Sequence, residues 1–273
     1  MTKIKDILAI RLDEDIKSVI DLNQQSEDAI IDELNGFILT ESLASHLADF
    51  CDFFSGTTAQ PGLWLSGFYG SGKSYFSKMI GFLLKNPVIQ GTSVRDRFLN
   101  KLVGLPNEGL LKNSINELGR TENHIVLFDA AKTTGNHGIS YMMMGAFLKS
   151  LDLNDDWVGI IEYNLMLSGR YQLFCDKVQN IYGESWLKRR RNMDEVYDTL
   201  EDTMLDGFCS QSAYDEMRDA AKLRIRDYDA NKLQEDLSRY LEEYQDRRIV
   251  FMIDEVSEAI AQKKINILDL EGV

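Results

Sequence analysis

The chain has 273 residues and a formal net charge of −14, so it can form one large domain or two smaller ones with an acidic surface. Such a surface repels a phosphate backbone, which argues against tight non-specific binding to DNA. No apolar run is long enough to span a membrane, and the charges among the first 20 residues argue against a signal peptide, so we expect a cytoplasmic protein.

Residues 1–60 predict an N-terminal helical segment packed on the core that follows. Thr40 is a candidate N-cap, and Gly56 ends a run of apolar residues at helical spacing, which comprises Leu43, Leu47, Phe50, Cys51 and Phe54. After a turn, LWLS at 63–66 predicts the first buried strand.

A glycine-rich loop, GFYGSGKS at 67–74, separates this strand from an amphipathic helix. The helix is indicated by apolar residues at i, i+3, i+4, i+7 and i+8, which are Phe76, Met79, Ile80, Leu83 and Leu84. Asn86-Pro87 ends it, and residues 88–123 predict short helices and turns.

HIVLFDA at 124–130 predicts a second buried strand, followed by a loop at 133–138. The next helix contains three adjacent methionines, which we interpret as core residues. Residues 61–153 would then form the first part of an α/β domain.

Residues 154–246 predict a charged helical insertion. Its basic run, Lys188 to Arg191, is interpreted as a solvated helix end, with a partner or nucleic-acid contact as the alternative. The clearest helices are marked by Met193, Val196, Tyr197, Leu200 and Met204, and by Leu233, Leu237, Tyr240, Leu241 and Tyr244. A strand and a helix return within 247–273.

The loop matches the complete P-loop pattern, Gly67-x4-Gly72-Lys73-Ser74. Glycines let backbone N–H groups turn inward around phosphates, and the following helix directs its positive N-terminus at them. Lys73 would reach the β- and γ-phosphates, and the Ser74 hydroxyl would help to hold Mg²⁺. The sequence therefore predicts a nucleotide site.

The second half of such a site is predicted at IVFMIDE, residues 249–255. Asp254, at the end of a buried strand, would lie beside Mg²⁺, and Glu255 would polarise the attacking water as a general base. An ordinary strand followed by an acidic helix start is the alternative. Asp129 ends a similar strand without a following glutamate, and we expect it near Lys132, either facing the site from the neighbouring strand or simply ending that strand.

Cysteines and histidines do not predict a metal centre. The cysteines have no C-x-x-C spacing, and no two histidines are three or four residues apart: Cys51, Cys175, Cys209, His46, His124 and His137.

The stretch LWLSGFYGSGKSYFSKMIGFLLKNP resembles the P-loop region of the ATPases of BREX (bacteriophage exclusion) systems, the BrxC/PglY family. The aromatic pair Phe68-Tyr69 and Tyr75 after the serine are typical of that family. The opening IKDILAIRLDEDIKSVIDLNQQSEDAIIDEL and the later FDAAKTTGNHGIS and IVFMIDEVSEAIA are also similar, so the resemblance spans most of the chain.

The resemblance implies an AAA+-like P-loop NTPase, with a parallel sheet flanked by helices, that forms a homo-oligomer at full length. It implies ATP and Mg²⁺ as cofactors, and a role in phage defence with a methyltransferase and a phosphatase-like partner. Family members are longer, so we expect a C-terminal truncation, with the sensor residue and arginine finger beyond residue 273; Arg189 to Arg191 are unsupported candidates for the finger. The implied phosphate-binding residues are Gly67, Gly70, Ser71, Gly72, Lys73, Ser74 and Tyr75, with Asp254 beside the metal and Glu255 activating water.

Two other functions stay open. A nucleotide-dependent scaffold would use ATP to order a binding surface with little turnover, and the acidic insertion could dock its partners. A P-loop kinase would need a basic lid, for which the run at 188–191 is the candidate, but the Asp-Glu ending of the last strand favours a hydrolase.

Overall fold

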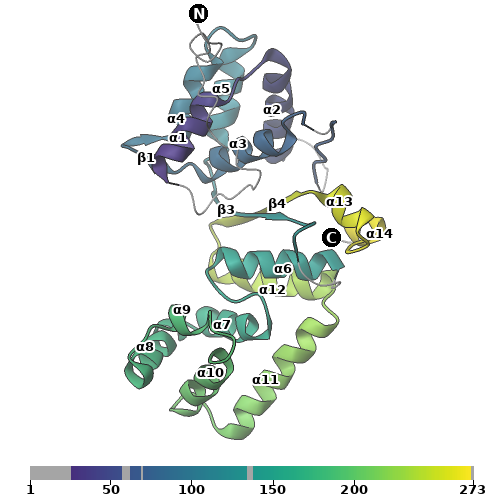
Figure 1. The fold of residues 1–273 in the computed structure, drawn as a ribbon. Helices are drawn as coiled ribbons and strands as arrows, with labels where there is room; N and C mark the ends of the chain where they lie inside the picture. The colour runs from purple at the N-terminus through teal and green to yellow at the C-terminus, as the bar shows by residue number, and fades with distance from the viewer. Residues whose placement is uncertain (1–25, 57–61, 69, 134–137, 272–273) are drawn as a thin grey trace, which may run out of the picture. The chain divides into compact units, whose positions relative to one another are not determined.

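The computed structural model describes residues 26–56, 62–68, 70–133 and 138–271. The predicted opening at 1–25, Tyr69, His137 and most of the loop at 133–138 lie outside these ranges. The chain is an α/β protein that divides into two compact units (Figure 1). Unit 1 contains Met1–Phe128 and Arg247–Asp254, and unit 2 contains Asp129–Asp246 and Glu255–Val273.

Unit 1 is built around a helix that follows the glycine-rich loop. Its helices are α1 (Glu27–Gly36), α2 (Glu41–Phe54), α3 (Lys73–Lys85), α4 (Val94–Leu99) and α5 (Glu108–Glu117), with a 3-10 turn, η2 (Asn100–Leu102), and an antiparallel hairpin of β1 (Val88–Ile89) and β2 (Thr92–Ser93). The predicted boundaries of α2 and α3 are confirmed. The Thr40 hydroxyl accepts a hydrogen bond from the N–H of Leu43, 3.3 Å away, and α3 ends at Asn86 in a left-handed conformation.

The core of unit 1 forms where α3 is covered on most of its sides. Met79, Phe82 and Leu83 of α3 are almost fully buried, together with Leu47 of α2 and Ile115 of α5. The apolar stripe that the sequence predicts on α3 is therefore its packing surface, and burial of this kind stabilises a helix more than propensity does.

Two parallel strands, β3 (Glu122–Asp129) and β4 (Arg247–Asp254), pair across a long stretch of sequence. Both strands were predicted. These strands are less buried than expected, because Val126 of β3 is buried whereas the other residues of β3 and β4 are half-buried or exposed. A parallel strand is buried when helices or strands cover both of its faces.

The predicted strand at 63–66 is also wrong. Residues 62–68 have no regular secondary structure, and the side chains of Leu63 and Trp64 are 45% and 64% exposed. A short apolar run in the sequence is consistent with a strand, but a strand also needs a neighbouring strand to hydrogen-bond with. The run itself does not show whether the fold provides one.

Unit 2 is helical in the residues that the structure describes. Its helices are α6 (Gly138–Ser150), α7 (Trp157–Leu167), α8 (Tyr171–Tyr182), α9 (Trp186–Arg189), α10 (Val196–Leu205), α11 (Gln211–Arg226), α12 (Ala230–Glu243), α13 (Val256–Ala261) and α14 (Ile267–Glu271). The expected insertion lies within this unit, and α6 belongs to it as well. Met193 precedes α10 and is 67% exposed, so it is not part of the helix face predicted there.

Helices α6 and α12 run side by side in unit 2 (Figure 1). Phe147 of α6 meets Tyr240 of α12 edge to face, with ring centroids 5.1 Å apart, and the Tyr163 hydroxyl of α7 donates to the Asp236 carbonyl of α12 at 2.7 Å. The three adjacent methionines of α6 are buried, as expected for core residues. Within the described ranges, none of the helices has both the length and the apolar character required to cross a membrane.

Candidate functional site

The glycine-rich loop reaches α3 through two glycines in left-handed conformations. Gly70 has φ 77° and Gly72 has φ 85°, values that cost a residue with a side chain about 1 kcal/mol or more. Gly72 is the N-cap of α3 and supplies no side-chain hydrogen bond to its first turn. An anion can therefore accept from the first N–H groups of α3, where the helix dipole also favours negative charge.

The loop is tight between Gly67 and Ser71. A Cβ atom on Gly67 would lie 2.9 Å from the Ser71 hydroxyl oxygen, and the N–H of Ser71 donates to the Phe68 carbonyl at 3.1 Å. A side chain at position 67 would force the Ser71 hydroxyl to turn away, so this close approach favours glycine there.

Lys73 folds its ammonium back over the loop. The Nζ atom donates to the carbonyls of Gly67, at 2.9 Å, and Phe68, at 3.0 Å. Lys73 and Ser74 are half-buried, whereas Gly67 and the segment 70–72 are exposed. The loop thus combines a lysine ammonium, a helix N-terminus and an open face, which together can hold phosphate groups.

Tyr75, expected to bind the cofactor, contacts α1 in this structure. Its hydroxyl donates to the backbone carbonyl of Glu33, and its ring meets Phe37 edge to face, with centroids 5.4 Å apart. Burial, with a further effect of the Glu33 charge, raises the pKa of Tyr75 to about 12, so the hydroxyl remains a donor at neutral pH. These contacts indicate a role in packing α3 against α1.

Asp254 is the last residue of β4, and β4 packs against α3 in unit 1. One carboxylate at a strand end and one serine hydroxyl at a helix start are hard oxygen ligands of the type that Mg²⁺ prefers. The described residues contain no cluster of three or more metal-type side chains. Asp254 and Ser74 alone are enough for a magnesium site, because Mg²⁺ keeps several waters and takes its other ligands from nucleotide phosphates.

Glu255 follows Asp254 in a left-handed conformation, with φ 53°, and is the N-cap of α13. A left-handed backbone is uncommon for glutamate, and such strain often accompanies functional positions. Glu255 and Asp129 belong to unit 2.

Asp129 ends β3 and organises the turn that follows it. Its carboxylate accepts from the N–H groups of Ala131, at 3.0 Å, and Lys132, at 3.2 Å, and pairs with the Lys132 ammonium at 2.9 Å. The expected proximity of Lys132 is confirmed, and these bonds favour the interpretation of Asp129 as a strand end.

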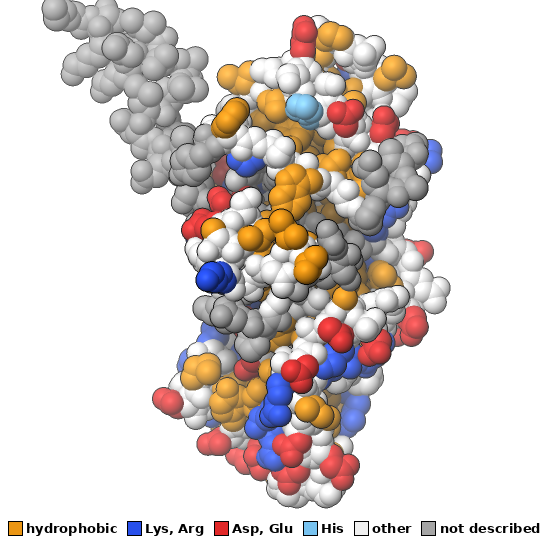
Figure 2. Space-filling model, turned by 90° about the vertical axis from the view of Figure 1, so that its right-hand side faces the viewer, with side chains coloured by type: hydrophobic (Ala, Val, Ile, Leu, Met, Phe, Trp, Pro, Cys, Tyr) orange, Lys and Arg blue, Asp and Glu red, His pale blue; other side chains and the backbone are white. Residues whose placement is uncertain are grey.

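The basic run is not a uniform solvated helix end, which corrects that prediction. The Arg190 guanidinium is buried and pairs with Glu162 at 3.0 Å and with Asp152 at 2.8 Å. Arg189 donates to the Thr199 hydroxyl at 2.8 Å and lies over the ring of Tyr182. On the face drawn in Figure 2, basic side chains are interspersed with acidic ones.

Glu162 is the charged residue that sequence reasoning missed. It is fully buried on α7, and it accepts from the Trp186 indole at 2.6 Å, the Tyr171 hydroxyl at 3.0 Å and the N–H of Asn154 at 2.7 Å. The available signal was a single carboxylate within an otherwise apolar helix, WVGIIEYNLML, since a buried charge requires partners.

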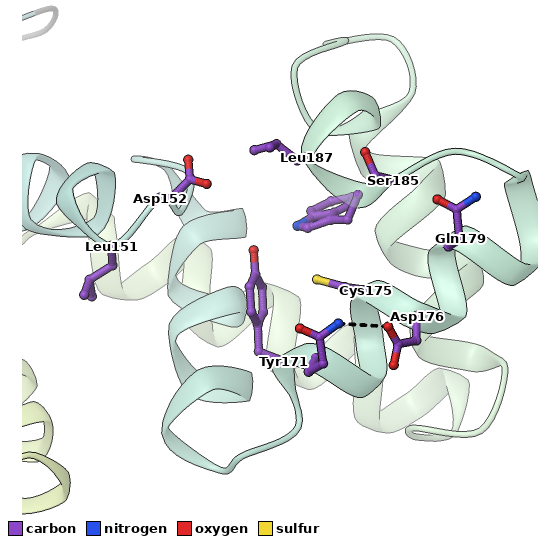
Figure 3. A pocket seen from close by; sticks show the side chains of 10 residues that line it. Leu151, Asp152, Tyr171, Cys175, Asp176, Gln179, Ser185 and Leu187 are labelled. Atoms are coloured by element: carbon purple, nitrogen blue, oxygen red, sulfur yellow. Dashed lines mark hydrogen bonds between the residues drawn. The ribbon is translucent and has the colours of Figure 1, made fainter. Parts of the chain in front are cut away.

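A pocket of about 340 Å³ lies beside this network in unit 2 (Figure 3). Tyr171 and Trp186 bound it together with Cys175, and the Gln172 amide donates to Asp176 at 2.8 Å. None of the site residues predicted from the sequence lines it. Burial raises the pKa of Cys175, which makes its thiol a poor nucleophile at neutral pH.

The chain is thus an α/β protein with a glycine-rich loop at the start of a largely buried helix. No family model matches the chain, and no solved structure matches it significantly.

Proposed function

We propose that this chain is an AAA+-like P-loop NTPase that binds Mg·ATP at residues 67–74. The observation that carries the proposal is the Lys73 ammonium held over a loop whose left-handed glycines lead directly into α3. The backbone N–H groups and the α3 N-terminus would receive the phosphates, and Lys73 would move from the loop carbonyls to the β- and γ-phosphates.

Ser74 and Asp254 would hold Mg²⁺, directly or through water. The metal would neutralise charge that develops on the phosphates during transfer. Glu255 would accept a proton from the water that attacks the γ-phosphorus. The bond from that phosphorus to the bridging oxygen would break, which yields ADP and phosphate.

The resemblance to the BREX ATPases supports a place for this activity in bacterial anti-phage defence. There the nucleotide cycle would drive assembly or remodelling of a complex with a methyltransferase and a phosphatase-like protein. The same resemblance supports a homo-oligomer. Arg189 and Arg190 are engaged within unit 2, which argues against both as the finger or as a kinase lid.

Calorimetric titration of Mg·ATP into the chain tests the proposal, with Lys73→Ala as the binding-deficient variant. Removal of a charged donor to phosphate should weaken binding by about 10- to 150-fold, because such hydrogen bonds contribute about 1.5–3 kcal/mol. Lys112→Ala is the matched control, since Lys112 lies on α5 and pairs with Glu108. The proposal fails if the wild-type chain does not bind Mg·ATP, or if Lys73→Ala binds it equally well. Binding without turnover would favour the scaffold.

A further inference from the structure

Helix α3 carries two functions on neighbouring faces. Its first residues, Lys73 and Ser74, belong to the phosphate loop, while Tyr75 and Lys78 contact α1. Residues three apart share a helix face, so Tyr75 and Lys78 form one contact surface that begins one residue after Ser74. Any displacement of this surface therefore also displaces the end of the loop.

A single residue of α1 receives both side chains. The backbone carbonyl of Glu33 accepts a hydrogen bond from the Tyr75 hydroxyl. The Glu33 carboxylate accepts a second one from the Lys78 ammonium, 2.7 Å away. The Lys78 side chain is only 5% exposed and the Glu33 side chain 26%, so this ion pair is largely shielded from water. A shielded, charge-assisted hydrogen bond of this length is stronger than one between neutral groups.

Close packing reinforces the two bonds. Phe37, the C-cap of α1, meets the Tyr75 ring edge to face, and a Cβ on Gly36 would lie 3.6 Å from the Tyr75 hydroxyl. Lys101 donates to the carbonyls of Asn35, at 3.3 Å, and Phe37, at 2.9 Å. The last turn of α1 is thus fixed against both α3 and the 3-10 turn η2.

The first turn of α3 depends on this attachment because its own cap is weak. Gly72 makes no side-chain capping bond, and the loop residues 70–72 are exposed. The Lys73 ammonium bonds to the loop itself, whereas the Tyr75 hydroxyl attaches the first turn of α3 to another helix, α1. The ring and hydroxyl of Tyr75 hold the helix start while the loop itself is open.

We propose that Tyr75 and Lys78 couple α1 to the phosphate loop, so that docking of α1 and binding of phosphate at residues 67–74 stabilise each other. This inference rests on the proposed nucleotide site and adds a regulatory input to it. Coupling of this kind is reciprocal: a partner that pulls α1 away from α3 would weaken nucleotide binding, and nucleotide would hold α1 in place. Tyr75 and Lys78 are positioning residues in this scheme.

The test uses Tyr75→Phe in the full chain, which keeps the ring packing and removes the hydroxyl. The Kd for Mg·ATP should rise about fivefold, the equivalent of one net hydrogen bond. Mg·ATP should also slow amide hydrogen exchange in α1 of the wild type, and this protection should be reduced in the variant. Glu33→Gln, which retains the carbonyl but removes the charge facing Lys78, should change both readouts in the same direction.

Ser93→Ala controls for a general loss of stability. The Ser93 hydroxyl accepts from the N–H of Asp96 at 3.1 Å as the N-cap of α4, so its loss weakens unit 1 but leaves the bonds of Tyr75 and Lys78 to Glu33 in place. We expect its Kd to stay within about twofold of the wild type. The coupling is refuted if Tyr75→Phe and Glu33→Gln lower the melting temperature as Ser93→Ala does and leave Kd and exchange in α1 unchanged. Absence of Mg·ATP binding by the wild type would instead refute the nucleotide site, and the coupling with it.

Discussion

His124 shows how burial changes the chemistry of a single residue. It lies half-buried on β3, and burial, followed by the charges of Arg247 and Lys85, lowers the pKa of its imidazole to about 4, with Glu122 opposing the shift. The imidazole in an unfolded chain has a pKa of about 6.5. Between these values the unfolded state binds more protons, so stability is complete above pH 6.5 and falls as the pH drops toward 4.

We therefore predict that acidification from pH 7 to pH 5 destabilises the wild-type chain more than His124→Gln. The difference should be about 1 kcal/mol, after a discount for the partial solvent exposure of the imidazole. Urea unfolding of both proteins at the two pH values measures it, and carboxylates elsewhere contribute equally to both. An identical pH dependence would show that His124 is protonated as easily in the folded chain as in the unfolded one.

The residues of the candidate site differ in how far the sequence could predict them. The loop from Gly67 to Ser74 is a run of adjacent residues whose geometry follows from glycine flexibility and the helix that comes next, so its pattern can be recognised locally. The bond from Tyr75 to Glu33 joins residues 42 apart in sequence, and no local pattern indicates that pairing.

Helices were predicted more accurately than strands because a helix satisfies its backbone within its own segment. The periodic stripe on α3 and the Thr40 cap of α2 required only neighbouring residues. The strand predicted at 63–66 required a partner elsewhere in the chain and was wrong. Helix α9 has only 4 residues and is too short to be stable by itself, so it depends on the burial of Trp186 against the rest of the protein.

Packing of α7, α8 and α9 depends on one buried charge pair. Arg190 joins Glu162 of α7 to Asp152, and Tyr171 of α8 and Trp186 of α9 donate to the same glutamate. Although burial opposes it, the Glu162 charge raises the pKa of Arg190, so the guanidinium remains ionised. Removal of one partner would leave a charge buried without compensation.

Arg190→Met should therefore destabilise unit 2 by about 3 kcal/mol. Arg191→Met is the matched control, because Arg191 is the next residue, is exposed and should change stability by no more than about 0.5 kcal/mol. Hydrogen exchange in α7, α8 and α9, together with urea unfolding, measures the effect. Equal stability of the two variants would mean that water or other donors compensate Glu162.

At the scale of the whole molecule, charge is the feature with a direct functional consequence. The net charge of −14 opposes a phosphate backbone, and Arg189 and Arg190 of the basic run are paired inside unit 2. The run therefore presents mainly Lys188 and Arg191 to solvent.

We predict that the chain binds a 20-base-pair DNA duplex with a Kd above about 100 μM at 0.15 M salt, the weak end of non-specific binding. Fluorescence anisotropy of a labelled duplex measures this. A Kd in the low micromolar range with a steep salt dependence would contradict the prediction. The double variant Lys188→Ala/Arg191→Ala would then show whether the exposed part of the basic run is responsible.

The amino-acid sequence by itself determined the helices α2 and α3, the strands β3 and β4, and the phosphate-loop pattern between them. These features depend on residues close together in the chain, where periodicity, capping and glycine flexibility act. Only the tertiary structure decided that Arg190 pairs with Glu162, 28 residues away, that Tyr75 faces α1, and that residues 63–66 form no strand. Each of these depends on which distant segments meet, and the free energy of such contacts is set by burial and partner geometry that the chain acquires only when it folds.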